Sequence, residues 1–291
     1  MRWVLSVVLL FPLLAGAQQF VDVFKLDYRL SPENQYQDSA ASSVDIADVH
    51  LGAFLPFEQD NGDYIILGAN ATWSTIDDLR VSSVGLIGGV RNTWRSDSDK
   101  WEYMTLLLPK INKDDGKILA RDVQLGFFHL FYYKKRPGLR YKFGMYMNDD
   151  LFGLLLLPLF GADWQIDERT RLELTVPMSA SIRRTLNDRW MAGFNYVGRK
   201  YSFNLSAANS YLEVADNTVT LFSDLYLTEK LVLNLQVGHS VLRAYDRYPI
   251  GEGVDLSFGA VDLNDDRKPL NSPLSQGIVL KPVLFYRFTS D

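Results

Sequence analysis

Segments of about ten residues in which apolar and polar side chains alternate recur along the whole chain. In LRYKFGMYMN, residues 139–148, the odd positions are all apolar or aromatic, whereas the even positions include Arg140 and Lys142. Successive side chains of an extended strand point to opposite faces, so each such strand has one apolar face and one polar face. The apolar faces must be covered by a protein core or by lipid. The chain is therefore expected to be all-β.

Turn-forming segments separate these strands, and short ones alternate with longer ones. In transmembrane barrels the periplasmic turns are short and the extracellular loops are longer. The pattern predicts an antiparallel, up-and-down transmembrane β-barrel of about 14 strands, or about 12 if a hairpin is miscounted, with both termini periplasmic. The short breaks are 59–63, 95–100, 134–138, 167–170, 198–200 and 228–230, and the longer ones are 31–43, 75–83, 110–121, 148–152, 183–189, 209–218 and 245–276.

The polar faces separate a membrane barrel from a soluble periplasmic β-sandwich. A sandwich exposes heavily charged faces to water. Here the polar faces are mainly Ser, Asn, Gln, Gly and Thr with occasional charges, which suits the interior of a barrel whose outside contacts lipid. The side chains predicted to place charge or a titratable group in the lumen are Lys25, Asp27, Asp48, His50, Arg140, Lys142, Glu173, Arg183 and Arg184.

Tryptophans stand close to the predicted strand ends. An indole ring combines a large apolar surface with one N–H donor, so it settles at the membrane–water interface and builds aromatic girdles. Packing at hairpin ends of a soluble protein is the alternative explanation. The predicted girdle consists of Trp73, Trp94, Trp101, Trp164 and Trp190.

The first residues, MRWVLSVVLLFPLLAGA, have the organisation of a secretory signal peptide. A cation precedes a short apolar run, which ends in small residues suitable for cleavage after Ala17. The run is too short for a membrane-spanning helix. We expect a signal peptide at 1–17 and a single barrel domain at 18–291. The absence of cysteine in an exported chain fits a bacterial envelope, so the expected location is the outer membrane of a Gram-negative bacterium.

No pattern in the chain demands catalysis, a cofactor or a metal ion, and we expect the protein not to be an enzyme. The three histidines lie within predicted strands, where His50 shares a face with Asp48 and His239 falls in an apolar register, near a girdle or a bulge. The DLNDDRK segment (262–268) lacks the glycine and glutamate that a calcium loop requires. The basic residues are scattered, which argues against nucleic acid as a partner.

The block LPLFGADWQIDERTRLELTVPMSASIRRTLNDRW, residues 157–190, resembles the central hairpin of a bacterial outer-membrane β-barrel family known only as a domain of unknown function. The residues that carry the resemblance are Pro158, Gly161, Trp164, Leu174, Pro177 and Arg183, together with KLDY at 25–28. The resemblance implies a barrel and supplies no site residues. Outer-membrane barrels usually end in an aromatic residue, whereas here Phe288 stands three residues before the end.

The favoured function is a passive pore or transporter for small polar solutes. The expected partners are outer-membrane lipid, such solutes, and the barrel-assembly machinery that would insert the chain. Internal salt bridges could instead fill the lumen, which would make the protein a non-conducting structural or surface-binding barrel. A barrel lipid hydrolase is the third alternative, and it would need a histidine to meet a serine or aspartate at the membrane rim.

Overall fold

The computed structural model describes residues 19–94 and 100–290, which form a closed antiparallel β-barrel of 14 strands. The predicted signal peptide, 1–17, and most of the turn predicted at 95–100 lie outside the described residues. The strands are β1 (Gln19–Tyr36), β2 (Ser39–Glu58), β3 (Tyr64–Ile76), β4 (Leu79–Trp94), β5 (Trp101–Asp114), β6 (Val123–Arg136), β7 (Leu139–Asp150), β8 (Gly153–Gln165), β9 (Thr170–Val176), β10 (Ser179–Asn187), β11 (Trp190–Val197), β12 (Lys200–Leu205), β13 (Ser210–Tyr226), β14 (Leu231–Pro249) and β17 (Ile278–Ser290).

Each strand pairs with its neighbour in the chain, and β1 closes the ring by pairing with β17. β11 and β12 lie one after the other along the same edge of β13 and together make one strand of the wall. The short strands β15 (Leu256–Ser257) and β16 (Asp262–Leu263) form a hairpin in the last loop, and the 3-10 turns η1 (Ala120–Asp122) and η2 (Ser206–Ala208) lie in two other loops.

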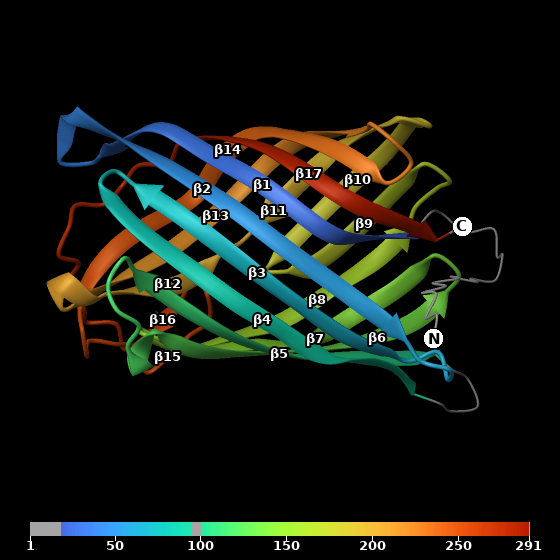
Figure 1. The fold of residues 1–291 in the computed structure, drawn as a ribbon, viewed down its shortest axis with the longest axis horizontal. Helices are drawn as coiled ribbons and strands as arrows, with labels where there is room; N and C mark the ends of the chain where they lie inside the picture. Colours follow the sequence, from blue (N-terminus) through green and yellow to red (C-terminus); the bar gives the residue numbers. More distant parts are fainter. Residues whose placement is uncertain (1–18, 95–99, 291) are drawn as a thin grey trace, which may run out of the picture.

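The strands are strongly inclined to the long axis, and the start of β1 and the end of β17 lie at the same end of the barrel (Figure 1). We call this the terminal end and the opposite one the loop end. The predicted barrel is thus confirmed, including its strand number, and its first and last strands begin and end on a common side. No helix in the described part of the chain is long and apolar enough to cross a membrane.

Two errors in the sequence-based assignment of strands compensate each other. The segment 171–182, predicted to be one strand, is a hairpin of β9 and β10 that turns at 177–178, although the alternation of side chains runs on across Pro177. The break predicted at 198–200 as a turn is instead a gap between β11 and β12, which run on in the same direction. The break at 183–189 belongs mostly to β10 and ends in a turn at the terminal end, not in an extracellular loop.

The loops at the loop end are also shorter than the polar composition suggests. β1 and β2 extend to a turn at 37–38, and β3 and β4 extend to a turn at 77–78, so most of 31–43 and 75–83 is strand. Most of the predicted break 209–218 lies within β13. Polar residues here line the inside of the barrel rather than a loop. The long connections at this end are 115–122 and 250–277.

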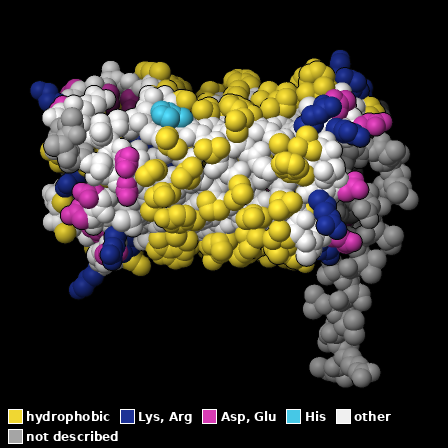
Figure 2. Space-filling view, turned by 90° about the horizontal axis from the view of Figure 1, so that it is seen from above, with side chains coloured by type: hydrophobic (Ala, Val, Ile, Leu, Met, Phe, Trp, Pro, Cys, Tyr) yellow, Lys and Arg dark blue, Asp and Glu magenta, His cyan; other side chains and the backbone are white. Residues whose placement is uncertain are grey.

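The outer face carries a broad apolar belt, while Lys, Arg, Asp and Glu gather at the two ends (Figure 2). In β7 the side chains of Tyr141, Phe143 and Met145 are exposed on the outside. Arg140 and Lys142 face inward, where both bind Asp163 of β8. The register predicted for this strand is therefore confirmed.

The predicted girdle tryptophans are on the outer face near strand ends. Trp94, Trp101, Trp164 and Trp190 lie by the terminal end, and Trp73 lies toward the loop end. Trp94 is 60% exposed and Trp73 is 51% exposed, as rings at a lipid boundary would be. The cluster at one end and the single indole at the other mark the two edges of the apolar belt.

Substitution of Met145, halfway along the outer face of β7, tests the orientation of the wall. We expect Met145→Arg to destabilise the inserted barrel by about 2–4 kcal/mol, because a guanidinium group would face the middle of the lipid layer. Lys142→Arg, on the lumen side of the same strand, is the matched control and keeps its charge. Denaturant unfolding in lipid vesicles measures both, and equal stability of the two variants would contradict a lipid-facing Met145.

At the loop end the wall does not continue as a simple ring. β12 leaves the course of β11, and its Asn204 bridges to Lys113 at the free edge of β5. This bridge closes a narrower ring inside the barrel mouth. The ring consists of β1–β5, β12–β14 and β17, and the ends of β6–β8 lie outside it. Residues 202–205 and 210–214 are accordingly buried on both faces of their strands.

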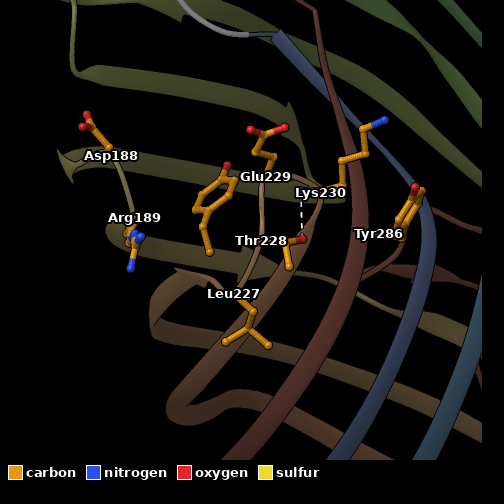
Figure 3. A pocket seen from close by; sticks show the side chains of 8 residues that line it. Asp188, Arg189, Leu227, Thr228, Glu229, Lys230 and Tyr286 are labelled. Atoms are coloured by element: carbon orange, nitrogen blue, oxygen red, sulfur yellow. Dashed lines mark hydrogen bonds between the residues drawn. The ribbon is translucent and has the colours of Figure 1, made fainter.

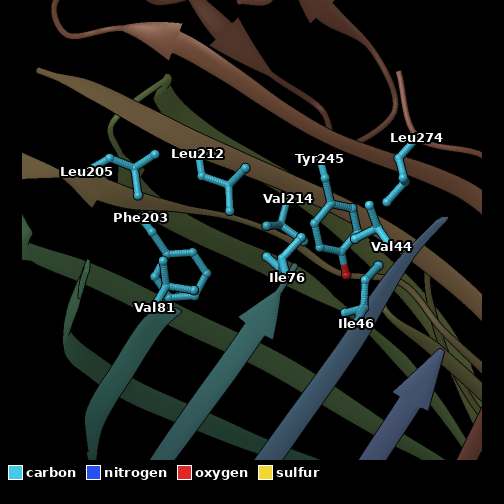
Figure 4. Packing of buried hydrophobic residues seen from close by; sticks show 10 residues of the cluster. All are labelled: Val44, Ile46, Ile76, Val81, Phe203, Leu205, Leu212, Val214, Tyr245 and Leu274. Carbon is cyan, nitrogen blue, oxygen red and sulfur yellow. The ribbon is translucent and has the colours of Figure 1, made fainter. Parts of the chain in front are cut away.

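The narrower ring is filled by apolar side chains, which Figure 4 shows pointing toward one another from opposite strands. All are at most 8% exposed. Burial of this many apolar side chains stabilises the inward course of β12 and β13, since each large one contributes about 1.5–3 kcal/mol when fully buried. The members are Val44, Ile46, Ile76, Val81, Phe203, Leu205, Leu212, Val214, Tyr245 and Leu274.

Candidate functional site

The inside of the barrel is the candidate functional site. Besides two smaller groups, Arg287 with Asp22 and Asp224 and Glu173 with Arg171 and Arg183, most of its charged side chains form three clusters at successive depths. The first, the rim cluster, lies near the terminal end on β4–β8. Glu102 binds Arg91 at 2.6 Å and Lys134 at 2.7 Å, and Asp163 binds Arg140 at 2.8 Å. Because each carboxylate is shared between cations, the cluster carries excess positive charge. Its members are Arg91, Glu102, Lys134, Arg140, Lys142 and Asp163.

The second, mid-lumen cluster surrounds Asp27 of β1. Its carboxylate binds Lys25 at 2.8 Å and Lys281 at 3.4 Å. His50 and Arg199 lie within electrostatic range of the same lysines. Arg199 enters the lumen from the gap between β11 and β12, so the interruption between these two strands places an additional cation in the interior.

The third, buried ion cluster lies directly beneath the apolar filling of the narrower ring. Asp216 accepts hydrogen bonds from Ser240 at 2.7 Å and from Tyr245 at 3.2 Å, and it is paired with Arg29 and with Arg243. Arg29 also binds Asp48 at 2.8 Å. All four charged side chains are at most 7% exposed. Together with the apolar filling, this cluster closes the axial path at the loop end.

Four lumen cations are more hydrated than the carboxylates that hold them. The side chains of Lys25, Arg91, Lys134 and Arg199 are 30–39% exposed, although all of them face inward. Their partners Asp27, Asp48 and Glu102 are 3–10% exposed. Two other groups show the reverse, since Asp22 is 26% exposed beside Arg287 at 2%, and Glu173 is 32% exposed between two arginines at 16%. Solvent therefore reaches the lumen from the terminal end and meets positive charge at these four cations, although the whole chain carries a formal charge of −5.

Eight of the nine predicted lumen side chains face the interior. Lys25, Asp27, Asp48 and His50 lie on β1 and β2, and Glu173 is held between Arg171 and Arg183. Arg184 was predicted to face the lumen, and the structure corrects this. It pairs across the sheet with Thr170 on the outer face, where its side chain is 57% exposed and lies 3.6 Å from Asp167 in the β8–β9 turn. Two adjacent arginines of one strand cannot both face inward.

Several charges of the lumen were missed in the sequence although they obey the same alternation. They were passed over because the segments that contain them were interpreted as loops or as isolated polar positions. Asp216 and Arg243 fell inside the predicted breaks or at their edges, and Arg29 stood beside one. The missed members include Arg29, Arg91, Glu102, Lys134, Asp163, Arg199, Asp216, Arg243, Lys281 and Arg287.

The three histidines do not converge. His50 faces the lumen, where its Nδ1 lies 3.0 Å from the Thr72 hydroxyl, whereas Asp48 on the same face binds Arg29. His129 is on the outer face and lies 2.7 Å from the Thr105 hydroxyl. His239 lies beside a register shift between β13 and β14, which is one of the two positions expected for it. Among the described residues, no group of three His, Asp or Glu side chains is placed to hold a metal ion.

A cavity of about 700 Å³ opens at the terminal end between the β10–β11 and β13–β14 turns (Figure 3). Its lining includes Asp188, Arg189, Glu229 and Lys230, whose side chains diverge around the opening. Turn residues make up most of this lining. The cavity therefore belongs to the rim of the barrel and not to the three lumen clusters.

Comparisons with known proteins find one family model and several solved structures. Residues 74–248 match a family described as Domain of unknown function (DUF6268). A search of curated proteins finds no match. Among solved structures, the COG4313 outer membrane channel from Pseudomonas putida F1 is 7% identical, with 95% of this chain and 97% of that chain covered and a TM-score of 0.48. The TodX monoaromatic hydrocarbon channel is 9% identical, covering 95% and 91%, with a TM-score of 0.40. The NanC porin is 9% identical, covering 90% and 98%, with a TM-score of 0.37.

Proposed function

The chain belongs to the DUF6268 family, whose description assigns no activity, and we propose from its own geometry that it is a passive outer-membrane channel for small polar solutes, with a preference for anions. In this proposal the terminal end faces the periplasm of a Gram-negative cell, the apolar belt contacts the lipid, and the barrel-assembly machinery inserts the chain. The protein performs no catalysis.

The hydrated, cationic lumen is the observation that carries this proposal. A purely structural barrel needs its interior filled, and internal ion pairs can fill it. Here, however, inward-facing Lys25, Arg91 and Lys134 keep about a third of their side-chain surface in contact with solvent. Rings of such charges tune the ion selectivity of pores.

A planar-bilayer recording of the purified protein tests the channel. We expect discrete conductance steps and, across a KCl gradient, a reversal potential whose sign shows that chloride passes more readily than potassium. The lumen cations attract anions and repel cations at close range. The expected control is a lipid bilayer with detergent alone. Silent insertion, verified by protease protection of the barrel, would remove the channel function and favour the non-conducting barrel.

A further inference from the structure

The barrel wall has an aperture that strand pairing does not close. β8 pairs with β7 over its whole length but with β9 only from Phe160 onward, because the β9–β10 hairpin is short. On the other side, β10 pairs with β11 up to Val197, and β12 then turns inward. A window therefore lies between residues 153–159 of β8 and residues 200–205 of β12. The hairpin turn at 177–178 borders it toward the terminal end.

A segment of the last loop, residues 253–263, covers this window, and we call it the panel. Its β15 lies parallel to β8, with Ser257 opposite Leu155. On the β12 side, Lys200 donates to the Gly259 carbonyl at 3.2 Å and to Asp262 at 2.7 Å. The panel thus joins the two sides of the window as a separate piece of wall.

The panel is held more weakly than the strands around it. Apart from the β15 bridge, its backbone is tied to β8 through the Val254 amide, which donates to the Phe152 carbonyl at 2.7 Å. This close approach requires Gly153, because a Cβ there would lie 2.4 Å from the Val254 carbonyl oxygen. The neighbouring strands β13 and β14 pair from Ser210 to Tyr226 with a single register shift. Segments with few backbone hydrogen bonds open at lower free energy than such ladders.

Behind the panel lies an apolar core between the inner face of β6–β8 and the outward face of β13 and β14, which we call the side core. Leu155, Leu157 and Leu159 of β8 pack against Tyr211 and Tyr248 here. Met104, Phe128, Tyr146 and Met178 pack against this cluster and are only partly buried, so the side core reaches the hydrated lumen. Most lumen walls of the barrel are polar or charged, whereas this one is apolar and aromatic.

The outside of the panel continues the apolar belt. Phe258 is 39% exposed, Val261 is 59% exposed and Leu263 is 43% exposed, next to the exposed Leu154 of β8. An opening here would expose the side core to lipid. In contrast, the axial route through the narrower ring is closed by buried ion pairs and apolar packing.

We propose that solutes leave or enter the loop end sideways, through the window when the panel moves, and that the favoured solutes are small amphipathic anions. This inference rests on the proposed channel function and adds its route and solute class. The cationic lumen attracts the anionic group. When the panel moves, the side core offers apolar side chains to an alkyl or aromatic part, whose burial is favourable in proportion to its apolar area.

The native chain contains no cysteine, so a single engineered disulfide can lock the panel. Leu155→Cys combined with Ser257→Cys joins β8 to β15 at residues that lie opposite each other. Thr75→Cys with Arg80→Cys joins β3 to β4, away from the window, and is the matched control. The purified full chain is placed in phospholipid vesicles, and entry of benzenesulfonate and of methanesulfonate is measured in the oxidised and the reduced protein.

For the reduced lock variant we expect benzenesulfonate to enter faster than methanesulfonate although it is larger. Oxidation should lower benzenesulfonate entry about tenfold, while the control disulfide should leave it unchanged. Undiminished entry in the oxidised protein would overturn the sideways route, and faster entry of methanesulfonate would overturn the solute class. If the reduced protein let neither solute enter the vesicles and showed no conductance, the channel function itself would be contradicted.

A second variant, which does not depend on a disulfide, should change benzenesulfonate entry in the opposite direction. Asp255 and Leu263 lie side by side, joined by a 3.3 Å hydrogen bond, so residues 256–262 can be replaced by two glycines. We expect this shortened panel to raise benzenesulfonate entry. Unchanged or reduced entry in a correctly inserted barrel would count against the panel as the barrier.

Discussion

Asp216→Ala is expected to destabilise the barrel by about 3–5 kcal/mol, because it leaves two buried guanidinium groups without their shared counter-ion. Arg29 and Arg243 are 3% and 0% exposed and cannot regain water where they lie. The loss also removes the hydrogen-bond acceptor of Tyr245 and Ser240. The midpoint of urea unfolding in lipid vesicles, followed by the heat-dependent shift in gel mobility of the folded barrel, measures the effect.

Asp216→Asn and Asp60→Ala are the controls for this prediction. The amide keeps the size of the side chain and one oxygen acceptor but lacks the charge, so its stability should fall between the native protein and Asp216→Ala. Asp60 lies exposed in the β2–β3 turn, and its loss should have almost no effect. If Asp216→Ala unfolded at the same urea concentration as Asp60→Ala, the buried ion cluster would not hold the narrower ring in place.

The alternation of side chains was sufficient to predict the ring, because every strand of the wall has lipid on one side and the interior on the other. The alternation could not predict where a strand leaves the lipid-facing wall and becomes buried on both faces. Residues 210–214 are buried on both faces, so their mixed composition has no period that distinguishes them from a loop. Residues 202–205 do alternate and were predicted as strand, but the alternation does not reveal that both of their faces are buried. The β9–β10 hairpin was missed for another reason, because its two short strands continue one apparent alternation across Pro177.

The candidate site shows the same division between local pattern and long-range pairing. Arg140 and Lys142 could be assigned to the lumen from their own strand alone. The partners of Arg29 could not, since Asp216 is 187 residues away and meets it only after the ring has closed. Likewise, nothing local to residues 253–263 indicates that they fill a gap beside β8, because the gap results from the length of a different hairpin.

Reversal of the mid-lumen charge should invert the ion selectivity of the channel. In Lys25→Glu combined with Arg199→Glu, two hydrated cations become carboxylates, and both stand where solvent reaches the lumen. A unit charge about 5 Å from a passing ion contributes about 0.8 kcal/mol even in a water-like medium. The double variant should therefore change the anion-to-cation permeability ratio by at least about tenfold. The reversal potential across a KCl gradient should change sign.

The graded control for this inversion is Lys25→Gln combined with Arg199→Gln, which removes charge without reversing it and should bring the reversal potential close to zero. Arg80→Glu changes the charge of the protein by as much as one of these reversals, but Arg80 is exposed outside the lumen beside the β3–β4 turn and should leave selectivity unchanged. Because the whole chain is acidic, a selectivity set by its net charge would favour cations from the start and would respond to Arg80→Glu. Such a response, or an unchanged reversal potential in the double glutamate variant, would show that ions do not pass the mid-lumen cluster.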